Sequence, residues 1–352
     1  MSIDRFLLRI PKVELHVHLE GSMRPAVLLE LARRNGIALP AQDEAGLKRW
    51  FRFTNFEHFV QVYLACSRAL RRPEDFQLLA LDVLAEQAYQ NVVYTEAHFT
   101  ISTHLANGVD GDEVLAALAE AIAEGERRYG VTLRLIPDIV RNVGVEPADR
   151  TLEWALAARQ RGVVAALGFS GSERLYPNEP FREHFAVAKR EGLHRTAHAG
   201  EHAGPESIRS ALEVCGAERI GHGVRAVEDP SLVEELRAAQ IPLEVCPTSN
   251  LCLGVTPDMP SHPFDRLYRS GVALSVNSDD PAFFNTNLTR EYLRLHQAFG
   301  YTAAQMAGLS LTAVRQAFLP EAERTAMEES FRRQFDILGQ ELFGAPVEPP
   351  VT

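Results

Sequence analysis

Eight short apolar segments alternate with helical patterns along this chain of 352 residues. Several of the segments are nearly continuous in Val, Ile and Leu, which is typical of parallel strands buried on both faces. Strands that alternate with helices favour a parallel sheet, and eight such units are enough to close a barrel. The sequence therefore predicts an α/β protein with one (β/α)8 barrel domain (a TIM barrel) over residues 1–352.

The expected strands follow one another at intervals that leave room for a helix between most of them. They cover residues 13–19, 92–99, 132–136, 163–169, 195–199, 219–221, 242–246 and 272–277. Two intervening segments show helical spacing clearly, because 112–129 and 230–239 each carry apolar side chains on one face and charges on the other. These segments are the expected crossover helices of the barrel.

Two regions exceed a minimal barrel. About 70 residues separate the first two strands, and Ser22 with Pro25 predicts the start of a helix that ends near Asn35 and Gly36. Because loops that follow barrel strands form the active face, we expect a helical insertion over residues 20–91 that acts as a lid. Residues 289–344 are expected to add helices on the side of the barrel.

Composition excludes several classes of function. The chain has 36 Lys+Arg against 47 Asp+Glu, a net charge of -11, which disfavours nucleic acid and anionic membranes as partners. It contains no apolar run of about 18 residues and no apolar leader, so neither a membrane span nor secretion is expected. The cysteines form no C-x-x-C pair, and we expect reduced thiols in a cytoplasmic protein that binds a small molecule. They are Cys66, Cys215, Cys246 and Cys252.

The first expected strand contains a possible metal motif, His16-Val-His18. Residues two apart on a strand point to the same side, so both imidazoles face the barrel interior, where they suit a borderline metal such as zinc. Taken alone, the pair is also compatible with two hydrogen-bonded core histidines.

Three later strand ends carry further polar residues. The fifth strand ends in Ala-His198-Ala-Gly-Glu201, the sixth gives Gly-His222-Gly, and the eighth ends in Asn-Ser-Asp279-Asp280. A closed barrel brings these ends into one ring beside the first strand. Three histidines and one aspartate supply a catalytic zinc site, and acid–base residues surround it. Packing does not explain such a set, since Asp and Glu are rarely buried unpaired.

These motifs resemble the adenosine deaminase branch of the amidohydrolase superfamily. The segments that carry the resemblance are PKVELHVHLEGS, AHAGE, RIGHGV, EVCPTSN and SVNSDDP, in this order between residue 11 and about residue 292. The resemblance implies hydrolytic deamination of a 6-aminopurine nucleoside, which converts adenosine or 2′-deoxyadenosine to inosine or deoxyinosine with release of ammonia.

The resemblance also implies one zinc ion per chain, held by His16, His18, His198 and Asp279. Related enzymes with two metals use a carboxylated lysine on the fourth strand. This chain has only three lysines, and none lies in residues 163–169, so a site with one metal is expected. The P-C-x-x-C signature of cytidine deaminases and the H-E-x-x-H signature of zinc proteases are both absent.

Four residues take the catalytic and purine-binding roles that the resemblance implies. Glu201 donates a proton to purine N1, and His222 orients or deprotonates the attacking water. Asp280 contacts N7, and the backbone of Gly171 contacts N3. Protonation of N1 makes C6 electrophilic, so we expect Glu201 to lie in a pocket that excludes water and raises its pKa.

The insertion contributes an aromatic series with helical spacing. Phe56, Phe59, Val60 and Tyr63 match the spacing of a family helix that covers the purine and ribose. The same spacing describes one face of any packed helix, so a purely structural function is the alternative.

Departures from the family pattern concern the 5′ end of the substrate. Glu20 replaces the usual aspartate, His98 stands where arginine is common, and Ser172 follows Gly171 in place of an aspartate. We expect Glu20 to lie beside the 5′ end, because it follows His18 by two residues. These differences leave room for a 5′-modified adenosine, such as 6-aminodeoxyfutalosine of menaquinone biosynthesis.

Other functions remain as alternatives. The same barrel and metal could deaminate free adenine or hydrolyse an ester or amide, although Ile220-Gly-His222-Gly favours a nucleoside over the I-D-H-G of adenine deaminases. An inactive barrel that binds nucleosides or protein partners is a third reading. Ammonia release from adenosine distinguishes the last class from the others.

Overall fold

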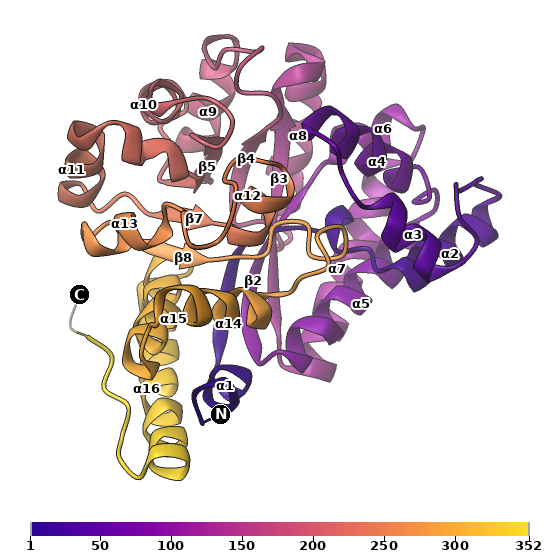
Figure 1. The fold of residues 1–352 in the computed structure, drawn as a ribbon. Helices are drawn as coiled ribbons and strands as arrows, with labels where there is room; N and C mark the ends of the chain where they lie inside the picture. Colours follow the sequence, from indigo (N-terminus) through magenta and orange to yellow (C-terminus); the bar gives the residue numbers. More distant parts are fainter. Residues whose placement is uncertain (1, 351–352) are drawn as a thin grey trace.

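The barrel is present in the computed structural model, which describes residues 2–350 (Figure 1). Eight parallel strands follow the order β1 to β8, each hydrogen-bonded to the next, with helices outside. The prediction of a (β/α)8 barrel is therefore confirmed. The strands are β1 Lys12–His18, β2 Val92–Phe99, β3 Thr132–Val140, β4 Ala166–Ser170, β5 His194–Ala199, β6 Arg219–His222, β7 Leu243–Val245 and β8 Leu274–Val276.

Helices surround the barrel and fill the two regions that exceed a minimal barrel. They are α1 Ser2–Arg9, α2 Pro25–Asn35, α3 Glu44–Trp50, α4 Phe56–Ser67, α5 Pro73–Tyr89, α6 Ile101–Ala106, α7 Gly111–Tyr129, α8 Val145–Gln160, α9 Arg182–Arg190, α10 Pro205–Val214, α11 Pro230–Ala238, α12 Pro247–Cys252, α13 Phe264–Arg269, α14 Leu288–Phe299, α15 Ala303–Gln316 and α16 Glu321–Phe343. Four 3-10 turns add η1 Glu20–Ser22, η2 Arg141–Val143, η3 Glu179–Phe181 and η4 Val224–Glu228.

Two strand boundaries differ from the prediction by three residues or more. β3 continues to Val140 because Pro137 and Asp138, which normally interrupt strands, are accommodated inside the barrel. Asp138 is fully buried, and its carboxylate is hydrogen-bonded to His98 of the neighbouring strand. β4 begins only at Ala166, because the preceding residues form a single bridge to β3.

The insertion between β1 and β2 contains α2, α3 and α4, and α5 then packs against α7 and β2 as a barrel helix. α2 ends at Asn35 with Gly36 in the left-handed conformation, as the sequence predicts. Of the two residues that predicted its start, Pro25 is confirmed as the first residue of α2, whereas Ser22 lies outside the helix. Ser22 belongs to η1 and donates its hydroxyl to the backbone oxygen of His18, and α2 starts at Pro25 without a side-chain cap.

The C-terminal helices pack on the side of the barrel, as expected. α15 lies against β8 and β1, and α16 runs along α1 and α15 (Figure 1). No helix within residues 2–350 combines the length and apolar character needed to cross a membrane. All four cysteines are free thiols, and only Cys252 is exposed.

The barrel closes between β8 and β1 largely through a side chain. Asn277 Oδ1 accepts hydrogen bonds from the backbone N–H groups of Leu15 and His16, at 2.8 and 3.1 Å. The backbone N–H of Ser278 donates to Glu14 at 2.9 Å. An isolated bridge between Val17 and Asp279 completes this seam and brings Asp279 against the first strand.

Candidate active site

The barrel brings the four predicted metal ligands together. One nitrogen or oxygen from each of His16, His18, His198 and Asp279 lies within 4.8 Å of the others, and all four residues are buried. The Nε2 atoms of His18 and His198 are 3.2 Å apart, and Asp279 Oδ1 lies 3.3 Å from His18 Nε2 and 3.5 Å from His16 Nε2. The cluster joins the ends of β1, β5 and β8.

These distances fit a metal ion. Ligand atoms 2.0–2.1 Å from a tetrahedral zinc stand about 3.3–3.4 Å from one another. Moreover, His16 Nε2 is buried without a hydrogen-bond partner among the described residues, which is the condition of a nitrogen reserved for a metal. Burial and the neighbouring imidazoles lower the pKa of His198 well below its usual value, so this ring is neutral and able to coordinate.

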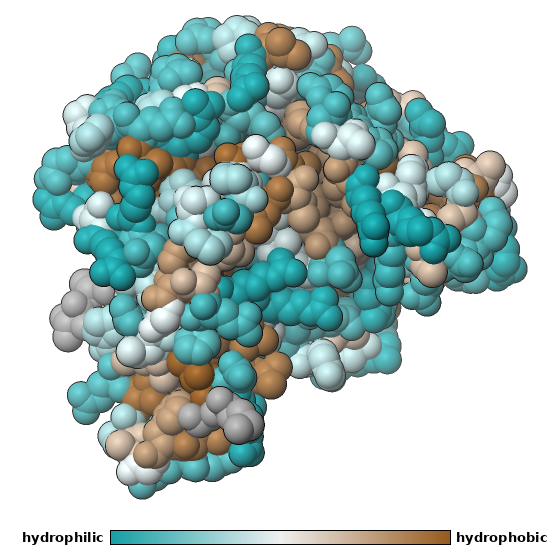
Figure 2. All heavy atoms as spheres, in the orientation of Figure 1, coloured by the Kyte–Doolittle hydropathy of each residue, from teal (hydrophilic) through white to brown (hydrophobic). Residues whose placement is uncertain are grey.

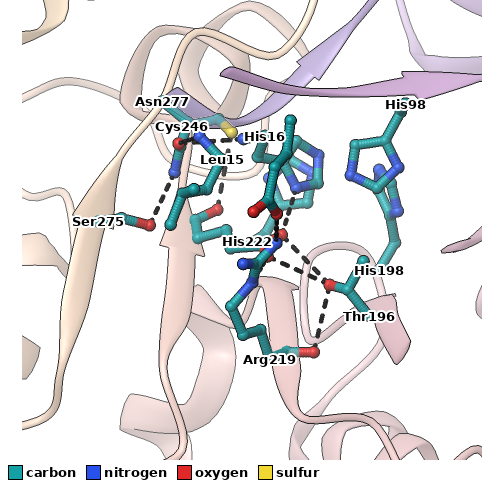
Figure 3. A network of polar contacts seen from close by, with 12 residues as sticks. Leu15, His16, His98, Thr196, His198, Arg219, His222, Cys246, Ser275 and Asn277 are labelled. Carbon is teal, nitrogen blue, oxygen red and sulfur yellow. Dashed lines mark hydrogen bonds and ion pairs between the residues drawn. The ribbon is translucent and has the colours of Figure 1, made fainter. Parts of the chain in front are cut away.

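A fully buried polar layer supports the cluster from below (Figure 3). Glu244 of β7 accepts a hydrogen bond from His16 Nδ1 at 2.8 Å and from Arg219 Nε at 2.6 Å. Thr196 also donates to Glu244, and Arg219 reaches on to Glu96 of β2. A hydrogen bond from one imidazole nitrogen to a carboxylate fixes the orientation of the ring and of its other nitrogen, so Glu244 orients His16 as a ligand.

His98 lies beside the same cluster. Its ring stacks on that of His18 at 4.9 Å between centroids and lies 4.5 Å from that of His16, while its Nδ1 is 2.8 Å from Asp138. Burial and the two neighbouring imidazoles lower the pKa of His98 well below its usual value. The neutral ring lies between Asp138 Oδ1 and the imidazole of His16, while Asp138 Oδ2 lies 3.9 Å from His18 Nδ1.

The two proposed acid–base residues face each other. His222 Nε2 lies 3.8 Å from Glu201 Oε2 and 3.8 Å from Asp279 Oδ2. The expectation of a raised pKa for Glu201 is wrong in this environment. Burial alone would raise the pKa, but the charges of His222 and His202 and a hydrogen bond from His202 bring it below its usual value. At neutral pH, the protonated form of Glu201, which is the form able to donate a proton, is therefore the minor one. The sequence pattern identified the carboxylate but not its imidazole neighbours.

Two active-site residues adopt a backbone conformation that is uncommon for residues other than glycine. His222 has φ 62° and Asp279 has φ 63°, both in the left-handed region. Such strain is retained where the surrounding structure holds it and a side chain must be aimed accurately. Here it turns both side chains from their strand ends into the barrel mouth.

The residues expected to bind the purine line one cavity beside the metal cluster. The cavity is lined by His18, Phe56, Phe59, Val60, Tyr63, Leu64, Thr100, Thr103, Val140, Asn142, Val143, Ser170, Gly171, His198, Glu201, His222, Leu253, Asp279 and Asp280. The α4 residues form its outer wall, and apolar side chains gather on this face near α4 and α12 (Figure 2). The structure therefore unites the predicted catalytic, substrate and lid residues except Glu20 and the deeper His16.

Two glycines, Gly21 and Gly171, allow close packing at the cavity wall because neither carries a Cβ atom. A Cβ atom on Gly21 would lie 1.8 Å from Asp280 Oδ1, so a side chain there would displace the carboxyl group. Gly171 has φ 96°, and a Cβ atom on it would lie 2.3 Å from Asn142. Burial and the charge of Asp279 raise the pKa of Asp280 well above its usual value, which favours a protonated carboxyl group that can donate a hydrogen bond.

Glu20 lies behind the cavity wall. β1 ends at His18 and the chain turns into η1, so the strand alternation used to place Glu20 beside His18 does not continue. Glu20 Oε1 instead accepts hydrogen bonds from Thr100 N and His104 Nε2, both at 2.9 Å. Thr100 lines the cavity, so Glu20 reaches its wall through the backbone of a neighbouring strand end.

Sequence reasoning missed several supporting residues. Glu173 accepts hydrogen bonds from the backbone N–H groups of Gly200, Glu201 and His202 and so fixes the loop that carries the acid. Asn250 contacts His222 Nδ1 at 3.3 Å. The signal available for Asn250 was its place at the end of EVCPTSN, one of the segments that carry the family resemblance.

The fold and the cluster at its strand ends define a hydrolase of the amidohydrolase superfamily. A family model described as adenosine deaminase matches residues 11–333, so the chain belongs to the adenosine deaminase family. An adenine deaminase of Bordetella parapertussis is 41% identical over 301 residues, which cover 86% of this chain and 94% of that protein. The enzyme acts on adenine-type substrates and releases the amino group.

Solved structures agree with this family membership. The adenine deaminase of Arthrobacter aurescens superposes with a TM-score of 0.88 at 31% identity, covering 92% of this chain and 98% of that chain. A Burkholderia ambifaria amidohydrolase with bound Zn gives a TM-score of 0.89 at 26% identity, covering 97% and 95% of the two chains. The His/Asp cluster of this chain is of the kind that holds such a metal.

Proposed function

We propose that this protein deaminates a 6-aminopurine nucleoside, with one zinc ion per chain held by His16, His18, His198 and Asp279. The observation that carries this proposal is one cavity with two parts. Glu201, His222 and Asp280 gather at its metal end, and α4 and η2 extend the wall beyond them. The first part suits the purine ring, and the second gives space for a group attached to it.

The chemistry follows from the positions of the residues. A zinc ion bound there would supply hydroxide near neutral pH by lowering the pKa of a water molecule to about 7. Glu201 gives a proton to N1, which draws electrons from C6, and His222 accepts a hydrogen bond from the attacking water. Because purine N7 is an acceptor, Asp280 must donate to it, and the proton favoured by its buried environment serves that purpose.

The choice of a nucleoside rests on the outer part of the cavity. Val140, Asn142 and Val143, at the end of β3 and in η2, line the cavity together with residues of α4. A free base that contacts Glu201 and Asp280 leaves this region unfilled, whereas a ribose on N9 extends into it. At the rim, Leu64 and Val143 are 40% and 53% exposed, which favours an apolar 5′ substituent as a variant of the same substrate.

Free adenine is the second candidate. The Bordetella and Arthrobacter relatives are both named adenine deaminase, and the first shares 41% of its aligned residues with this chain. In this case the outer cavity holds water, and Glu20 acts only as a support for Thr100. The four free cysteines support a reducing, cytoplasmic environment for either substrate.

The deciding experiment is kcat/KM for ammonia release from adenosine, 2′-deoxyadenosine, 5′-methylthioadenosine, 6-aminodeoxyfutalosine and adenine. We expect a nucleoside to exceed adenine by at least tenfold. Val143→Asp places a charge at the outer rim, so it should lower kcat/KM for the preferred nucleoside and leave that for adenine unchanged. A wild-type enzyme that prefers adenine would overturn the nucleoside proposal and retain the deaminase class.

A further inference from the structure

His202 follows the proposed acid directly and contacts it through the side chain. His202 Nδ1 lies 3.0 Å from Glu201 Oε2, close enough for the ring N–H to donate a hydrogen bond. The other carboxyl oxygen, Glu201 Oε1, is buried and has no hydrogen-bond partner among residues 2–350. Glu201 lines the cavity, whereas His202 does not. The two oxygens of the acid therefore have different environments.

The position of His202 is fixed on three sides. Its backbone N–H donates to Glu173 at 2.9 Å, and its backbone oxygen accepts hydrogen bonds from Arg174 Nε and Arg225 NH1 at 2.5 and 2.8 Å. Its ring packs against Phe56 of α4, with 4.5 Å between ring centroids. Phe56 also lines the cavity. The imidazole therefore lies between the wall formed by α4 and the carboxyl group of the acid.

A second metal is a poor explanation for this group. Glu173, Glu201 and His202 place ligand atoms within 4.8 Å of one another. However, both oxygens of Glu173 already accept hydrogen bonds, from three backbone N–H groups and from Ser207 Oγ. Glu173 therefore holds the loop through these hydrogen bonds. The function of His202 in the same group is what remains to be explained.

We propose that His202 is a positioning residue for Glu201. Its Nδ1–H holds Oε2 and turns Oε1 toward the cavity, where Oε1 delivers the proton to purine N1. Because Phe56 packs on the other side of the same ring, correct seating of α4 also orients the acid. This inference rests on the proposed function of the site and adds a residue that the family motif, which ends at Glu201, does not contain.

The test compares two substitutions at residue 202. His202→Phe preserves a ring against Phe56 but removes the donor, whereas His202→Asn offers an amide N–H near the position of Nδ1. We expect His202→Phe to lower kcat about 10- to 100-fold, the effect of losing one hydrogen bond to a charged group, with KM within about twofold of wild type. His202→Asn should recover most of the lost kcat. The substrate is the purine that wild type deaminates fastest.

Controls separate positioning from folding. His58→Phe changes a half-buried histidine of α4, whose ring contacts Phe53 and does not line the cavity, and should leave both constants unchanged. All variants should match wild type in metal content and melting temperature. Equal kcat for His202→Phe and wild type, or equal losses for the Phe and Asn variants, would overturn the positioning role alone. Wild type that releases no ammonia from any purine would overturn the proposed function and this inference with it.

Discussion

Two buried polar layers inside the barrel differ in how completely their atoms are paired. The upper layer consists of the proposed ligands with Glu201, His222 and Asp280, and the lower layer consists of Glu96, Thr196, Arg219 and Glu244. In the upper layer, four atoms lack a hydrogen-bond partner within the described part of the chain. They are His16 Nε2, His18 Nδ1, Glu201 Oε1 and Asp280 Oδ1.

In the lower layer, the charges are fully paired. Arg219 donates to Glu244, to Glu96 and to the backbone oxygen of Gln316, and Glu96 also accepts from Tyr94 and from Phe318 N. Leaving a buried polar atom unpaired costs roughly 1–3 kcal/mol, which a protein sustains where a ligand supplies the missing partner. Between these two layers, the unpaired atoms therefore lie in the one proposed to bind the metal and the substrate, and the paired charges lie in the one beneath it.

The largest expected effect comes from removing a proposed ligand. His198→Ala should abolish metal binding and reduce turnover toward the uncatalysed rate, a loss on the order of 10⁶-fold or more. Metal content and ammonia release measure this effect. Compared as metal-free proteins, the variant and wild type should unfold at similar urea concentrations, and a large loss of stability would contradict the division into two layers.

Substitution of Glu201 should likewise change activity without changing the stability of the protein. Glu201→Gln keeps the size of the side chain but cannot donate a proton to N1, so kcat should fall about 10²- to 10⁴-fold with metal retained. Single-turnover kinetics together with metal analysis provides the measurement. Near-normal turnover in this variant would reject Glu201 as the proton donor.

Removal of the lower-layer cation should act on stability instead. Arg219→Met leaves two buried carboxylates without their partner, so the free energy of unfolding should fall by about 3–5 kcal/mol. Urea unfolding measures the change. The matched control is Arg209→Met, which breaks half-buried surface ion pairs with Asp229 and Glu235 and should lower the free energy of unfolding by about 1 kcal/mol or less.

Glu244 of the lower layer accepts a hydrogen bond from His16 of the upper layer. Its substitution should therefore weaken metal binding less than the removal of a proposed ligand does. Glu244→Gln weakens the hydrogen bond that orients His16 and should reduce metal affinity about 10- to 100-fold. Competition with a chelator of known affinity measures this directly. An unchanged affinity would show that the ligands orient themselves without support from below.

The smallest predicted effect concerns Lys12 at the other end of β1. Burial lowers its pKa to about 7, while its ammonium donates to the backbone oxygens of Ile10 and Gln90. Between pH 7 and the unfolded pKa near 10.5, the unfolded chain binds a proton that the folded one does not, so stability rises with pH. Relative to Lys12→Met, wild type should gain about 1.4 kcal/mol per pH unit near pH 8–9. Parallel pH curves for the two proteins would contradict this shift.

The barrel and the upper layer were predictable because their signals are local. A strand end such as His198-Ala-Gly-Glu201 contains the chemistry and the turn in four residues. Charged residues that stand singly within the apolar strands, such as Glu244, could have indicated the lower layer. Their pairing was not predictable, since Arg219 meets Glu96 across 123 positions of sequence.

Other features depended on contacts between loops. Phe56 and His202 are in contact, but they lie in different segments that no single sequence motif joins. The lowered pKa of Glu201 follows from two neighbouring histidines, His202 and His222. The position of Glu20 was predicted wrongly because side chains alternate between the two faces only within a strand, and β1 ends at His18. Sequence pattern therefore identified most proposed functional residues but not the contacts that adjust them.

The seam closed by Asn277 sets the order in which this protein matures during synthesis. The ribosome releases His16, His18 and His198 well before Asp279, which follows the last strand. Until that strand arrives, the backbone N–H groups of Leu15 and His16 lack their acceptor, and the proposed ligand set is one oxygen short. We therefore expect metal capture by the proposed ligands to follow barrel closure, late in the synthesis of the chain.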